Sequence, residues 1–166
     1  MKPFYLKTTL AEADTKEGKI VGIAYTGEAI PFFDEYENFF VDLETLSVSK
    51  KKTPLLKDHV NEDPIGHAQV VIEDNKVSID GVVSRKTASG LNVISLSEDG
   101  FEWELSVGVY EGYVETDFNG SVNGRDVENA AVLRGGLLRE VSIVSLGADI
   151  IQDEIWVGTQ PNRISL

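Results

Sequence analysis

The sequence has no cysteine and few positive charges, and both deficits exclude classes of function. Its 166 residues include 15 Lys and Arg against 28 Asp and Glu, which gives a net charge of −13. Without cysteine the chain has no disulfide framework, no thiolate nucleophile and no Cys zinc site. A strongly acidic chain binds phosphate backbones and anionic membranes poorly, so we expect no nucleic-acid partner and no membrane partner.

Long apolar stretches are also missing. No apolar run reaches the ~18 residues of a bilayer-crossing helix, and the N-terminus lacks the apolar region of a signal peptide. We therefore expect the protein to act in the compartment where it is made. The length suits one domain, because single domains commonly run ~100–200 residues. We place this domain at residues 1–150 and a weakly patterned C-terminal strand or tail at residues 151–166.

Strand patterns dominate the chain. The clearest alternation of apolar and polar side chains is at Phe101–Tyr110. A hairpin is expected around Asp74–Asn75, and tight turns are expected at Asn119–Gly120 and Asn123–Gly124. The expected strands are Phe4–Leu10, Lys19–Ile30, Ala68–Glu73, Lys76–Val83, Phe101–Tyr110, Arg125–Leu133 and Leu137–Ser145.

Helical patterns are fewer. Residues Ala88–Glu98 have apolar side chains near helical spacing, and Gly100 could end this helix. Phe39–Val48 is ambiguous, and Asp34–Asn38 is expected to be an acidic, solvated loop. Many short strands with one or two helices predict a mainly β fold of the α+β class. The expected architecture is a closed or nearly closed β-barrel decorated by helices.

The chain has two histidines, His59 and His67, so any imidazole chemistry must use one of them. Acidic residues lie beside and between them, which raises the question of a metal site. The spacing matches no strong ligand pattern, and Pro64–Ile65–Gly66 indicates a turn between the two. We therefore expect no metal site, and the plain alternative is that both histidines are surface imidazoles.

Two polar residues stand out, Ser106 on the polar face of an alternating strand and Glu140 in an otherwise apolar strand. Ser106 is a candidate nucleophile, and Gly108 leaves its face open to a substrate backbone. The plain alternative is an ordinary serine on a solvated strand face. Burying Glu140 costs free energy unless it is paired. It could form an ion pair with Arg139 or Arg134, or it could hold an imidazole in one tautomer as the acid of a Ser-His-acid set.

Four ordered segments resemble the tailed-phage prohead (capsid maturation) protease family, which shares its fold with the herpesvirus assemblin proteases. The segments are VDLETL at 41–46, TPLLKDH at 53–59 with PIG at 64–66, WELSVG at 103–108, and LREVSIV at 138–144 leading to GAD at 147–149. Together they span most of the chain. The resemblance implies a β-barrel surrounded by helices and the activity of a serine endopeptidase.

The resemblance also assigns roles to residues. Ser106 matches the nucleophile and His59 matches the general base. Glu140 matches the third member, which is a His in the herpesvirus relatives. Gly147 and Ala148 match the oxyanion loop, although the relatives carry arginines there. The mechanism needs no cofactor and no metal.

The implied function is that of a phage or prophage serine endopeptidase that cleaves scaffold and capsid-protein segments during procapsid maturation. Those proteins are its substrates, and its location is the host bacterial cytoplasm, inside the assembling procapsid. We expect a homo-oligomer, for example a dimer, and self-cleavage within residues 151–166. One alternative is a catalytically inactive capsid-assembly or scaffolding module with the same fold. Another is an unrelated β-barrel binding module, in which His59, Ser106 and Glu140 do not converge.

Overall fold

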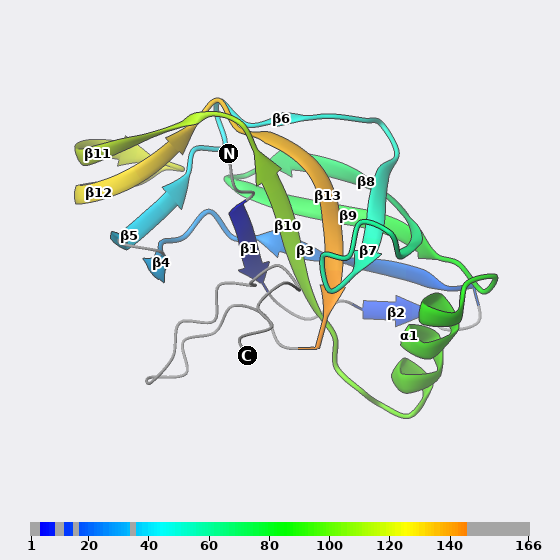
Figure 1. Ribbon diagram of the computed structural model, residues 1–166. Helices are drawn as coiled ribbons and strands as arrows, with labels where there is room; N and C mark the ends of the chain where they lie inside the picture. Colours follow the sequence, from blue (N-terminus) through cyan, green and yellow to red (C-terminus); the bar gives the residue numbers. More distant parts are fainter. Residues whose placement is uncertain (1–3, 9–11, 15–16, 34–35, 146–166) are drawn as a thin grey trace, which may run out of the picture.

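The structure, a computed structural model, describes the chain except for residues 1–3, 9–11, 15–16, 34–35 and 146–166 (Figure 1). The described residues are mainly β, with one helix. The elements are β1 (Phe4–Thr8), β2 (Glu12–Asp14), β3 (Lys19–Tyr25), β4 (Ile30–Phe33), β5 (Tyr36–Val41), β6 (Ser47–Val48), β7 (Thr53–Lys57), β8 (Pro64–Glu73), β9 (Lys76–Val83), α1 (Ala88–Glu98), β10 (Glu104–Tyr110), β11 (Tyr113–Val122), β12 (Arg125–Arg134) and β13 (Leu137–Val144).

The strands form two mixed sheets. The larger has nine strands in the order β1-β10-β13-β7-β8-β9-β3-β2, with β6 also paired to β13. Its pairs are antiparallel except where β13 meets β6 and β7. The smaller sheet has the order β11-β12-β5-β4 and extends to the left in Figure 1, away from α1. The neighbouring strands β10, β13 and β7 of the larger sheet are the ones that position the site.

The larger sheet curls but stays open, which corrects the expected closed barrel. Strand β3 comes close to β1 and β10. It pairs with β9 along one edge and with β2 at Lys19–Val21 on the other, and within the described residues it does not pair with β1. The sequence predicted a few helices, whereas the described residues contain one, α1.

The main core fills the inside of the curled sheet. Leu55 of β7, Leu105 of β10 and Ile143 of β13 are fully buried there. Burying such a side chain contributes about 1.5–3 kcal/mol each. The alternation predicted for β10 is confirmed for its core face, which consists of Leu105, Val107 and Val109.

Helix α1 has the bounds that the sequence predicted. The Thr87 side chain caps it by accepting a hydrogen bond from the Gly90 N–H at 3.1 Å. Gly100, with φ +87°, follows the helix end. Trp103 was expected in the strand, but it lies before β10, buried, and its indole N–H donates to the Val93 carbonyl at 3.2 Å. No helix among the described residues is long and apolar enough to cross a membrane.

Three local predictions were wrong. The expected strand Lys19–Ile30 is interrupted, because Gly27 takes φ +75° against the Asn75 carbonyl. Residues 36–38 of the expected acidic loop belong to β5, where they pair with β4 despite their polar composition. Asn119–Gly120 lies inside β11, whereas the turn at Asn123–Gly124 is confirmed, with φ values of 51° and 72°.

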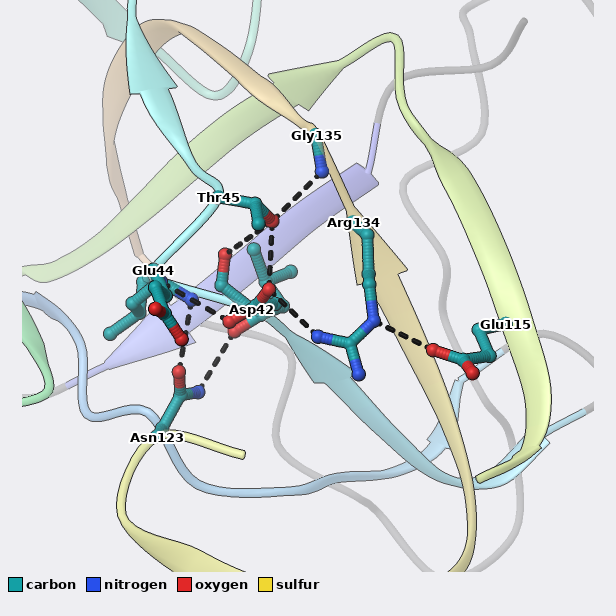
Figure 2. Close-up of polar contacts among 9 residues, drawn as sticks. Asp42, Glu44, Thr45, Glu115, Asn123, Arg134 and Gly135 are labelled. Atoms are coloured by element: carbon teal, nitrogen blue, oxygen red, sulfur yellow. Dashed lines mark hydrogen bonds and ion pairs between the residues drawn. The ribbon is translucent and has the colours of Figure 1, made fainter. Parts of the chain in front are cut away.

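A polar cluster lies at the connections between the two sheets (Figure 2). Asp42 is 3% exposed, and its Oδ2 lies 2.9 Å from Arg134 Nη1 and 2.8 Å from Thr45 Oγ1. Arg134 also bonds Glu115 at 2.7 Å, and this hydrogen bond raises the pKa of the guanidinium against the opposing effect of burial. The Thr45 hydroxyl accepts from the Gly135 N–H at 2.9 Å, at the start of the connection to β13. The cluster thus links the end of β12 to the segment between β5 and β6.

Candidate active site

Three of the predicted site residues meet on the larger sheet. Ser106 lies in β10, Glu140 lies in the adjacent β13, and His59 lies in the loop that follows β7. His59 Nε2 is 2.9 Å from Ser106 Oγ, and His59 Nδ1 is 2.7 Å from Glu140 Oε1. The convergence contradicts the alternative in which these residues lie apart.

Strand register places the serine and the acid on one face. In the antiparallel β10–β13 pair, Ser106 is opposite Ser142 and Gly108 is opposite Glu140. Residues two apart in a strand share a face, and so do directly opposed residues. All four residues therefore lie on the face of the sheet that His59 covers.

Gly108 makes room for Glu140, which corrects the expectation that it leaves space for a substrate. A Cβ atom at position 108 would lie 2.2 Å from Glu140 Oε1 and 2.8 Å from Cδ. Real Cβ atoms do not approach other heavy atoms so closely. The space above Gly108 is thus filled by the carboxylate.

His59 reaches the serine from a tight turn with an unusual backbone. Strand β7 runs parallel to β13, and Asp58 and His59 follow it with φ values of 50° and 59°. Such left-handed conformations cost an L-residue roughly 1–2 kcal/mol. The Asp58 N–H donates to the Ile143 carbonyl at 3.2 Å, and the His59 N–H donates to Ser142 Oγ at 3.1 Å. Strand β13 thus holds the strained turn at two consecutive residues.

The site is largely shielded from solvent. Ser106 is 4% exposed, Glu140 is 3% exposed, and the His59 side chain is 16% exposed. An ionised carboxylate only accepts hydrogen bonds, so an ionised Glu140 beside a neutral His59 requires the imidazole proton to be on Nδ1. Nε2 then presents its lone pair to the Ser106 hydroxyl. The arrangement can remove a proton from the serine, as a nucleophile–base pair requires.

A fourth residue, which the sequence analysis missed, completes the hydrogen-bond network. Ser142 is fully buried, and its hydroxyl lies 2.8 Å from Glu140 Oε2. The signal that could have found it is its spacing of two residues from Glu140, which puts both side chains on one strand face.

The alternative partners for Glu140 are engaged elsewhere. Arg134 is bound to Asp42 and Glu115, and the Arg139 guanidinium lies 5.2 Å from the ring centre of Tyr110. Glu140 therefore contacts His59 rather than Arg134 or Arg139, and the alternative of an ion pair with an arginine was wrong.

The remaining candidates do not join the site. His67 is exposed on β8. Gly147 and Ala148 lie outside the described residues, so the oxyanion assignment stays a prediction. Among the described residues, no group of three or more His, Asp or Glu side chains could hold a metal ion. Asp58 pairs with Lys57, and Asp63 accepts a hydrogen bond from Ser89.

The three side chains thus have the order and the contacts of a nucleophile, a base and an orienting acid. Comparisons with known protein families, curated proteins and solved structures found no match. The interpretation of the site therefore depends on its own chemistry and on the motifs that carry these three residues.

Proposed function

We propose that the protein is a serine endopeptidase of the prohead protease kind, which cleaves scaffold and capsid-protein segments during procapsid maturation. The observation that carries this proposal is the connected set Ser106–His59–Glu140, with contacts of 2.9 and 2.7 Å. The resemblance supports it independently, because the three residues lie in three of the four ordered segments.

The proposed reaction is acyl transfer to water. His59 Nε2 takes the hydroxyl proton as Ser106 Oγ attacks the scissile carbonyl carbon. The imidazolium then gives this proton to the leaving amine as the C–N bond breaks, which leaves an acyl-enzyme. A water molecule next loses a proton to His59 and attacks the ester, and the departing Ser106 oxygen recovers the proton.

The other groups have supporting roles. Glu140 holds the imidazole and stabilises its positive charge. We assign the oxyanion to backbone N–H groups near Gly147 and Ala148. One such donor contributes roughly 2.7–4 kcal/mol in other serine proteases.

The finer architecture and the location belong to the same proposal. We interpret the curled sheet as a nearly closed barrel of the herpesvirus-protease kind, which the approach of β3 to β1 and β10 supports. The protease domain covers residues 1–150, and residues 151–166 are the proposed self-cleavage segment. The enzyme acts as a homo-oligomer inside the procapsid, in the host bacterial cytoplasm. Its net charge of −13 supports both exclusion of the genome and docking to basic scaffold segments.

Co-expression with the capsid and scaffold proteins tests this function. The wild-type chain should yield shortened capsid and scaffold proteins, and Ser106→Ala should leave both at full length. Ser121→Ala, an exposed serine on β11, serves as the matched control and should cleave like wild type. Identical products from wild type and Ser106→Ala would overturn the proposal. Assembly without any cleavage would favour the inactive scaffolding module.

A further inference from the structure

Ser142 links the two partners on which the serine depends. Its hydroxyl oxygen lies 2.8 Å from Glu140 Oε2 and 3.1 Å from the backbone nitrogen of His59. The side chain is fully buried, so water does not compete for these contacts. One hydroxyl thus bonds the side chain of the acid and the main chain of the base.

The direction of each hydrogen bond is fixed by chemistry. A backbone N–H can only donate, so Ser142 Oγ accepts from His59. An ionised carboxylate can only accept, so the single hydroxyl proton of Ser142 goes to Glu140 Oε2. No buried side-chain N or O atom in the described part of the chain is left without a partner. With an ionised Glu140 and a neutral His59, the network has a single arrangement, in which the lone pair of Nε2 faces the Ser106 hydroxyl.

One contact of Ser142 restrains the carboxylate of Glu140, and the other restrains the backbone of His59. Glu140 uses Oε1 for the imidazole and Oε2 for Ser142, so the plane of the carboxylate is fixed at both oxygens. The bond to the His59 N–H holds a residue with φ 59°, which would relax toward a less strained conformation without it.

We propose that Ser142 is a positioning residue, which keeps Glu140 and His59 in register with Ser106. This inference rests on the proposed function, because Ser142 acts on the nucleophile through the other two residues. Ser142 does not touch the Ser106 oxygen in the network described above. Its loss should therefore lower kcat and leave KM nearly unchanged.

The first test compares Ser142→Ala with wild type in the hydrolysis of p-nitrophenyl acetate. We expect kcat to fall about 10- to 100-fold, because a buried acceptor and a buried donor both lose their partner. Thr53→Val is the matched control. It removes a fully buried hydroxyl on β7 that bonds the Lys50 carbonyl at 3.1 Å, outside the network. It should destabilise the fold without lowering kcat.

A double-mutant cycle separates positioning from general damage. In a Glu140→Gln background, Ser142→Ala should lower kcat much less than it does in wild type, because its main partner has already been changed. An equal loss of kcat in both backgrounds would mean a merely structural role and would overturn the proposal.

A proton NMR measurement, which needs no turnover, tests the positioning role separately from the proposed function. The hydrogen-bonded Nδ1–H of His59 should give a downfield proton NMR signal in wild type and in Thr53→Val. In Ser142→Ala this signal should shift or broaden. An unchanged signal in Ser142→Ala would contradict the positioning role, even if wild type hydrolyses the ester. A changed signal in a protein without hydrolysis would support the positioning role while the proposed function fails.

Discussion

Replacing His59 with alanine should lower the rate of scaffold cleavage by about 10⁴- to 10⁶-fold. His59 is the residue whose side chain contacts both Ser106 Oγ and the Glu140 carboxylate, at 2.9 and 2.7 Å. Without it the serine keeps its proton, and losses of this size follow removal of the base in well-characterised serine proteases. The measurement is the rate of scaffold cleavage by purified protein.

His67→Ala is the matched control for this prediction. His67 is exposed on β8 and is the other histidine of the chain, so its removal should leave the cleavage rate unchanged. Thermal unfolding of both variants shows whether each is folded. Cleavage by folded His59→Ala at the wild-type rate would exclude His59 as the base.

Replacing Gly108 with alanine should cost nearly as much activity as losing the acid. The added Cβ would lie 2.2 Å from Glu140 Oε1, so the carboxylate has to leave His59 Nδ1. Position 108 is not among the glycines with positive φ, so the backbone itself accepts alanine. We expect cleavage to fall by about 10⁴-fold, the cost of losing the orienting acid in a Ser-His-Asp protease.

The double variant Gly108→Ala/Glu140→Ala identifies the cause. It removes the clash, so it should have the activity of Glu140→Ala alone and be no less stable than that single variant. If Gly108→Ala lowers the activity of the Glu140→Ala protein further, Gly108 has a role beyond making room. Wild-type activity in Gly108→Ala would contradict the geometry of the site.

The three central residues could be predicted from the sequence because each stands out locally. Ser106 lies on the polar face of an alternating strand, Glu140 is an acid in an apolar strand, and His59 is one of two histidines. The roles proposed for them come from the ordered motifs. Their separation along the chain says nothing by itself about distance in space.

The contacts of Gly108 and Ser142 could not be predicted, because they depend on strand register. Gly108 was expected to face a substrate, but the β10–β13 register puts Glu140 opposite it. Ser142 joins the network because the turn after β7 brings the His59 N–H to its hydroxyl. These contacts are long-range and leave no local pattern.

The open sheet and the pairing of Arg134 were missed for a similar reason. Strand β3 pairs with β9 and with the short β2, Glu12–Asp14, rather than with β1, and so short a strand leaves little pattern in the sequence. Arg134 was a candidate partner for Glu140, but the polar cluster between the sheets engages it with Asp42 instead (Figure 2).

The central claim is that Ser106 is a nucleophile activated by its neighbours. Its most direct test is to incubate the wild-type protein with a fluorophosphonate, which bonds covalently to activated serines, and to locate the added mass by peptide mass spectrometry. We predict a single adduct, on Ser106, formed in wild type and absent in His59→Ala. An unmodified Ser106, or an adduct that forms equally well without His59, would contradict the account.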